Sequence, residues 1–122
     1  MQTAPAAVFR SLAFGLEARI ATLNDRSGSC AVSLRGELDA LTAPPLLRML
    51  SDLVDAGHAC VDLDMHELTF IDAAGLRTLQ QVAHAAESRG GRLSLSHTAR
   101  QVDRMLAIAG LNASRSAVID EA

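Results

Sequence analysis

The stretch from Cys60 to Gly75 constrains this 122-residue chain most, because a strand pattern changes there into a helix pattern within a few residues. The alternating apolar positions of the strand are Ala59, Val61, Leu63 and Met65. The apolar positions at helical spacing are Leu76, Leu79, Ala83 and Ala86. Asp72 lies between the two patterns, and an aspartate there is expected to cap the first helical turn and to suit its dipole. We therefore expect a strand, a compact turn and a helix to meet at Asp72.

Two further strands are predicted upstream, over 16–23 and 30–35, with the turn-rich segment 24–28 between them. This pattern predicts an antiparallel hairpin. Gly36 is expected to end the second strand. Thr42 is expected to cap a helix whose first turn holds Pro44 and Pro45, where a missing amide proton costs little.

The chain then repeats a unit of strand and helix. The first helix is expected to end at Gly57, before a strand over 59–64, and this order implies a right-handed crossover and a parallel pair. A helix over 73–89 follows, then a strand around Leu93 and Leu95, and then a helix from the capping box at 98–101 to Gly110. A short last strand is expected over 117–119. The pattern predicts an α/β fold, a mixed sheet with a parallel centre covered by helices.

A chain of this length fits one domain. We assign residues 16–122 to that domain and residues 1–15 to an N-terminal extension. The extension is expected to be mobile or loosely docked. Alternatively, Val8, Phe9, Leu12 and Leu16 form the apolar stripe of a short helix.

The composition excludes several classes of function. The net charge is −3 and the aromatic residues are three Phe, so the chain has neither the basic field nor the stacking residues that nucleic acids need. All 11 Lys and Arg residues are arginine. This excludes Schiff-base chemistry, a P-loop lysine and a receiver domain that depends on a lysine.

Cysteines and histidines give no sign of a metal, a cofactor or a catalytic group. Cys30 and Cys60 fall in separate strands without metal-ligand spacing, and we interpret them as buried thiols in a reducing cytoplasm. The four histidines are scattered, with His66 in the predicted turn and His97 after a strand, so we expect no enzyme. No apolar run approaches the roughly 18 residues of a membrane span, which predicts a cytoplasmic protein without membrane insertion.

The segment 63–76, read with Gly36-Glu37-Leu38-Asp39, resembles the STAS domain of bacterial anti-sigma factor antagonists. The likeness spans roughly residues 16–119. Members of that family usually carry Gly-Glu-hydrophobic-Asp after the second strand. They carry Asp-Ser-Ser-Gly or Asp-Ser-Thr-Gly where this chain has Asp72-Ala73-Ala74-Gly75.

The resemblance assigns roles to residues in this chain. It implies a partner-binding face made by Glu37, Asp39, Asp72, Ala73, Ala74, Gly75, Leu76 and Arg77. The partner it implies is an anti-sigma factor or a serine-kinase-like ATPase. In the family, that kinase phosphorylates a serine at this helix start, and alanine cannot accept a phosphoryl group. We therefore expect an antagonist that phosphorylation at the usual position cannot switch, with Thr69 and Thr78 in structural roles.

Two alternatives stay open. The bare helix N-terminus suits a small anion, a nucleotide or a lipid headgroup, so the domain could instead be a ligand sensor or a scaffold without anti-sigma activity. An exposed edge strand or the Phe-bearing N-terminal stretch also leaves room for a homo-oligomer.

Overall fold

The computed structural model describes residues 6–22 and 28–108. It contains five strands and three helices in that part of the chain. The strands are β1 (Ala6–Ala13), β2 (Leu16–Thr22), β3 (Ser29–Leu38), β4 (Cys60–Ile71) and β5 (Arg92–Ser96). The helices are α1 (Ala43–Asp55), α2 (Ala73–Ser88) and α3 (Arg100–Ile108).

The strands form one mixed sheet in the order β1-β2-β3-β4-β5. The pairs β1–β2 and β2–β3 are antiparallel, whereas β3–β4 and β4–β5 are parallel. The predicted hairpin, the parallel crossovers and the α/β class are therefore confirmed. The predicted last strand over 117–119 lies outside the described residues.

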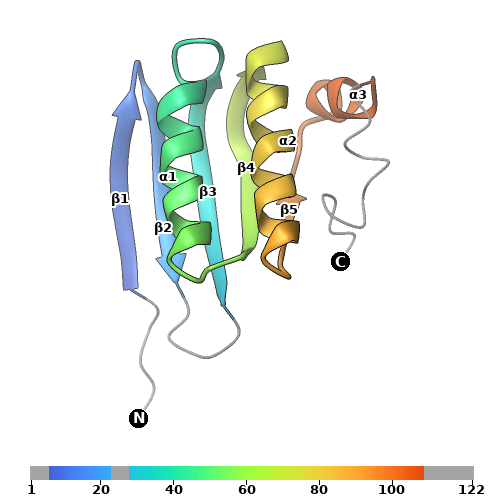
Figure 1. Ribbon diagram of the computed structural model, residues 1–122. Coiled ribbons are helices and arrows are strands. Elements are labelled where there is room, and N and C mark those ends of the chain that lie inside the picture. Colours follow the sequence, from blue (N-terminus) through green and yellow to red (C-terminus); the bar gives the residue numbers. More distant parts are fainter. Residues whose placement is uncertain (1–5, 23–27, 109–122) are drawn as a thin grey trace.

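Helices α1 and α2 lie side by side across one face of the sheet, and α3 lies beyond β5 (Figure 1). The core fills the space beneath the two covering helices. Alternate residues of β3 and β4 are buried there, as the strand pattern predicted, and they meet the apolar sides of α1 and α2. The largest fully buried side chains include Leu34, Leu46, Leu50, Leu63 and Leu79. No described helix combines the length and the apolar character needed to cross a bilayer.

The N-terminal stretch differs from its prediction. Residues 6–13, which the sequence analysis placed in a mobile extension or a short helix, form the edge strand β1. Phe14 and Gly15 have positive φ angles of 47° and 85° and make the tight turn into β2. The strand was hidden because Val8 is 50% exposed and Phe9 is 60% exposed. An edge strand with exposed apolar residues shows no clean alternation.

Two strands are longer than predicted. β3 does not end at Gly36 but continues to Leu38, with a register shift between Gly36 and Glu37. Gly36 has φ +120°, and a Cβ there would lie 2.7 Å from the Gly15 carbonyl oxygen, so the strand needs glycine to bend at this point. The predicted turn after Met65 is also wrong, because β4 runs on to Ile71 and carries His66 within the strand.

Candidate functional site

Two loops meet at the carboxyl ends of β3 and β4, at the upper edge of the sheet in Figure 1. Leu38 and Ile71 are paired across the two strands, and the Asp72 amide donates a hydrogen bond to the Leu38 carbonyl at 3.1 Å. Asp39 and Asp72 therefore follow directly on a hydrogen-bonded pair of strand ends. The family resemblance implied one face that contains both aspartates, and the structure brings their two loops together.

The Asp39 carboxylate organises the loop that leads into α1. Its Oδ1 accepts hydrogen bonds from the amides of Leu41 at 3.0 Å and Thr42 at 3.1 Å. Thr42 stands at the predicted N-cap position, but its side chain makes no cap hydrogen bond with the helix. Its buried hydroxyl instead donates to the Glu37 carbonyl at 2.9 Å and accepts from the Asp39 amide at 2.8 Å. The loop is therefore fixed from within, and Glu37 at its start is exposed.

Asp72 is the N-cap of α2, as predicted. Its backbone is extended, and its Oδ1 accepts a hydrogen bond from the Gly75 amide at 3.1 Å. A carboxylate of the protein itself thus occupies the positive end of this helix dipole. The Gly75 amide is therefore already engaged, so this helix end has one free donor fewer for an anion from outside the chain.

The two alanines differ in exposure. Ala73 is exposed on the first turn of α2, whereas Ala74 is half-buried and packs against the core. Arg77 is exposed one turn further along and Leu76 is half-buried. Ala73 is therefore the small residue that a binding partner would contact at this helix start.

Gly75 is buried at the base of the site. A Cβ at this position would lie 2.7 Å from Leu38 Cγ and 2.8 Å from Ile71 Cγ1. The missing side chain lets the first turn of α2 lie directly on the ends of β3 and β4. Gly75 therefore serves the packing beneath the site and holds the two loops together.

Two exposed apolar residues belong to the same surface, and the sequence analysis missed both. Leu41 in the loop before α1 is 59% exposed, and Phe70 at the end of β4 is 48% exposed. Phe70 and Ala73 line a small apolar pocket of about 210 Å³ together with Met105 of α3. The sequence carries no signal for this exposure, because Phe70 was read as part of a turn and Leu41 as a loop residue.

A wider groove lies next to Ala73 between α1 and α2. It has a volume of about 950 Å³, and Ala40, Ala74, Arg77 and His84 are among the residues that line it. Its floor is formed by small and apolar side chains, and Arg77 and His84 add polar groups. The surface around Ala73 therefore offers apolar contact with hydrogen-bonding groups beside it, which is the composition of a protein interface.

The titratable side chains outside this site form two small groups. The His66 and His97 rings are 6.5 Å apart, and His97 Nδ1 lies 3.4 Å from Asp64 Oδ1, although the sequence predicted scattered histidines. Burial, and to a lesser degree the neighbouring Cys60 thiol, raises the pKa of Cys30 to about 11. Both cysteines are free; Cys30 is buried as predicted, whereas Cys60 is half-buried. Among the described residues, no group of three His, Cys, Asp or Glu side chains has the arrangement of a metal site.

Solved structures with a similar fold include regulators and a transporter domain. An anti-sigma factor antagonist from Mycobacterium paratuberculosis is 24% identical, with a TM-score of 0.63 over 82% of this chain and 85% of that chain. The Bacillus cell fate determinant SpoIIAA in its phosphorylated form is 17% identical, with a TM-score of 0.64 over 96% and 92% of the two chains. The STAS domain of a SulP transporter from Vibrio cholerae is 20% identical, with a TM-score of 0.56 over 72% and 70%. At these identities the likeness establishes the fold alone.

The family itself is established by the sequence. No curated protein matches the chain. The family model described as "Mlab, STAS domain" matches residues 21–119, which is most of the chain and includes both loops of the site. The resemblance noted from the residues around Asp39 and Asp72 is thereby confirmed, and this protein belongs to the STAS domain family.

Proposed function

We propose that this protein is a cytoplasmic regulator that binds a partner protein through the surface around Ala73. This partner surface comprises Glu37 to Leu41, Phe70 and the first turn of α2 as far as Arg77. The partner class is an anti-sigma factor or a serine-kinase-like ATPase. Binding is not switched by phosphorylation at the usual position, because that position is Ala73 or Ala74.

The observation that carries the proposal is the exposed methyl group of Ala73, which lines a small apolar pocket with the exposed Phe70 side chain. Leu41, in the loop before α1, is 59% exposed, and Phe70, at the end of β4, is 48% exposed. Apolar side chains of this size at a loop cluster are typical anchors of a protein interface. The capped carboxylates of Asp39 and Asp72 beside them favour a partner with hydrogen-bond donors.

Charge explains why the family's switch would act on the partner and not on the fold. A phosphoryl group adds nearly two negative charges, and a helix N-terminus tolerates them within its own chain. At a protein interface the same charges beside Asp39 and Asp72 would oppose a dry or acidic contact. Ala73 has no oxygen to accept the group, so this route to an unbound state is closed.

The nearby threonines offer no evident replacement. Thr78 is 4% exposed and inaccessible to a kinase in the folded protein. Thr69 is exposed, and its hydroxyl donates to the Gly36 carbonyl at 3.2 Å, across the end of β3. Thr69 is therefore the residue whose phosphorylation an experiment must test for.

A second candidate is a STAS module without anti-sigma activity, either a sensor of a small ligand or a scaffold in a larger assembly. The similarity to a SulP transporter STAS domain supports the scaffold form. The hydrogen bond from the Gly75 amide to Asp72 weighs against an anion, nucleotide or lipid phosphate at the start of α2. The two candidates differ in the identity of the bound protein.

Affinity capture from the native cell tests the proposal. We expect the unmodified protein to retain an ATPase-type kinase, and Ala73→Glu to lose it by at least tenfold, because a carboxylate then replaces the exposed methyl. Ala56→Glu is the matched control, since Ala56 is exposed just beyond the opposite end of α1. Retention of a transporter subunit without any kinase would favour the scaffold, and equal capture by Ala73→Glu would refute the surface.

Kinase treatment tests the missing switch. With the captured kinase and ATP, intact mass should show no phosphorylation of the unmodified protein and one phosphoryl group on Ala73→Ser. Tryptic mapping should place that group on the new serine. A phosphopeptide containing Thr69 in the unmodified protein would contradict a permanently competent antagonist.

A further inference from the structure

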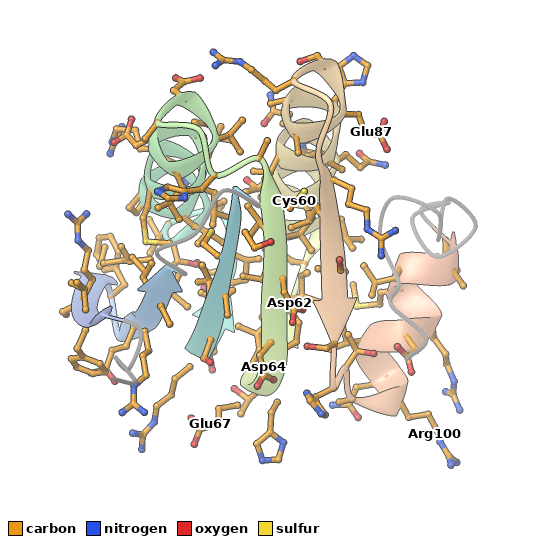
Figure 2. All side chains as sticks on the ribbon, turned by 90° about the horizontal axis from the view of Figure 1, so that it is seen from below. Cys60, Asp62, Asp64, Glu67, Glu87 and Arg100 are labelled. Carbon is orange, nitrogen blue, oxygen red and sulfur yellow. The ribbon has the colours of Figure 1, made fainter. Side chains whose placement is uncertain are left out.

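The sheet has a second face that the described helices leave open. α1 and α2 cover one face, and α3 lies beyond the β5 edge (Figure 1). Up to Leu34 of β3 and Met65 of β4, the residues between core positions point to the opposite side and are exposed or half-buried, and beyond the following register shift Arg35 pairs with Glu67. In Figure 2, Asp62, Asp64 and Glu67 project from β4 on the side away from α1 and α2. We call this surface the open face.

Strand register arranges the charges of the open face in rows. Arg19 of β2 pairs with Ser33 of β3, and Ser33 pairs with Asp64 of β4. In the next row Arg35 of β3 pairs with Glu67 of β4. Residues directly opposite one another point to the same face of a sheet. The basic side chains of these rows therefore lie on β2 and β3, and the acidic ones lie on β4.

The polarity of the open face is only partly compensated within the chain, where His97 Nδ1 lies 3.4 Å from Asp64 Oδ1. Among the described residues neither Arg19 nor Arg35 forms an ion pair, and both are exposed. Asp62 is also exposed on β4, in the row of Ala21 and Ala31. Two charges depart from the pattern: Glu17 is half-buried on β2 beside Arg35, and Arg92 begins β5.

The middle of the open face also carries only small side chains. Ala21, Ala31 and Ser33 occupy its centre, so that another flat surface can approach the backbone closely. Phe9 shares the row of Arg19 on the edge strand β1 and is 60% exposed. A flat centre of small residues with an exposed aromatic ring at one edge and opposite charges on its two halves is self-complementary in shape and in charge.

We propose that the open face is a homodimer interface, in which two copies pack sheet against sheet around a two-fold axis parallel to the strands. When such an axis runs between β3 and β4, it places β3 of one copy over β4 of the other, so Arg35 faces Glu67 of the second copy and Arg19 lies one strand away from the acidic strand. A two-fold axis in the plane of the sheet but perpendicular to the strands would instead place each strand over the same strand of the second copy. The acidic strand β4 would then face the acidic strand β4. Charge complementarity therefore selects the first arrangement, an isologous contact with the same patch on both copies.

This dimer leaves most of the proposed partner surface free; Glu37 and Phe70 pair at the upper end of β3 and β4, beyond the row of Arg35 and Glu67. Ala73, Leu41 and the groove between α1 and α2 lie at the helix-covered side and at the upper edge of the sheet (Figure 1). A dimer through the open face leaves both partner surfaces outward. The assembly would therefore present two partner sites on opposite sides.

The size of the open face sets the expected affinity. Five strands about 4.8 Å apart and about seven residues long, at about 3.3 Å per residue, give a projected area of roughly 550 Å² on each copy. This is the small end of specific interfaces, and many of its contacts are charged. We therefore expect a reversible dimer with a dissociation constant of about 10–100 µM that weakens as the salt concentration rises.

Sedimentation velocity with paired charge reversals tests the dimer. The unmodified protein should shift from the 12.9 kDa monomer toward twice that mass as its concentration rises from about 5 to about 500 µM. The acidic-face variant combines Arg19→Glu with Arg35→Glu. The basic-face variant combines Asp62→Arg with Glu67→Arg. Each variant should lose self-association by at least tenfold. All four positions are exposed, so the variants should keep the fold, which circular dichroism checks.

Mixing the two variants gives the decisive result. An acidic face meets a basic face only in the mixed pair, so an equimolar mixture should form a heterodimer at concentrations where each variant alone is monomeric. Arg48→Glu is the control, because Arg48 is exposed on α1, which covers the other face of the sheet, and it should dimerise like the unmodified protein. A monomer at every concentration, or a mixture that stays monomeric, would overturn the proposal.

Discussion

Gly75 lies where the first turn of α2 meets the ends of β3 and β4, and Gly75→Ala measures how tightly that junction is packed. The added methyl would lie 2.7 Å from Leu38 Cγ, 2.8 Å from Ile71 Cγ1 and 3.0 Å from Leu38 Cδ2. Carbon atoms in contact prefer about 3.5–4.0 Å. Leu38 and Ile71 are 0% and 1% exposed, so neither side chain has free space to enter.

Two opposing terms decide the net effect of Gly75→Ala. Overpacking a buried site costs about 1–3 kcal/mol. Alanine in place of glycine in a helix recovers up to about 1 kcal/mol through propensity. We therefore expect a net loss of about 1–2 kcal/mol in the free energy of unfolding. The urea midpoint should fall by roughly 1 M, since a domain of this size has a slope of about 1–3 kcal/mol per molar urea.

Ala73→Gly is the matched control, because Ala73 is exposed in the same helical turn and its methyl group has no buried contact. It isolates the propensity term and should cost up to about 1 kcal/mol. Adding the stability loss of Ala73→Gly to that of Gly75→Ala gives the packing term at Gly75. If Gly75→Ala were as stable as the unmodified protein, or more stable, Leu38 and Ile71 would have room to move and the close-packed junction would be refuted.

Three further predictions concern the cap, the thiols and the partner surface. Asp72→Ala should lower the free energy of unfolding by about 1 kcal/mol because the Gly75 amide loses its acceptor, whereas Asp72→Asn, which keeps an acceptor oxygen, should lose less than half of that in urea melts. The pKa of Cys30 is raised from 9.0 to about 11 in the folded protein, so the unfolded thiol ionises first. Stability should therefore fall by about 2–3 kcal/mol between pH 9 and 11, and Cys30→Ala should remove that slope from urea melts taken across this range. Leu41→Ser should reduce kinase capture by at least tenfold while the urea midpoint stays unchanged, and an equal loss of stability would contradict a surface role.

Local pattern was sufficient for the elements whose two faces differ sharply. α2 was predicted over 73–89 and lies at Ala73–Ser88, because its apolar repeat follows a strong N-cap at Asp72. β2, β3 and β5 were located for the same reason, since one of their faces is buried. Pattern failed for β1, where Val8 and Phe9 are both exposed, and for the end of β4, where Phe70 turns outward.

The candidate site was predicted in part. The strand ends and the Asp72 cap follow from residues close together in the chain, so sequence spacing identified them. The exposure of Leu41 and Phe70 depends on which segments pack over them, and spacing carries no information about that. The resemblance placed Gly75 in the partner-binding face, whereas the positions of Leu38 and Ile71 show that its missing side chain permits a close approach to the core.

By itself, the sequence determined the succession of strands and helices, the family, and the absence of a hydroxyl at the start of α2. These properties depend on residue identity and on neighbours within one or two turns. Only the tertiary structure decided which alanine is exposed and which apolar residues flank it. Only strand pairing placed Arg19 and Arg35 across from the acidic side chains of β4. Those features depend on contacts between segments up to about fifty residues apart, because register and packing, and not local propensity, fix which side chains share a surface.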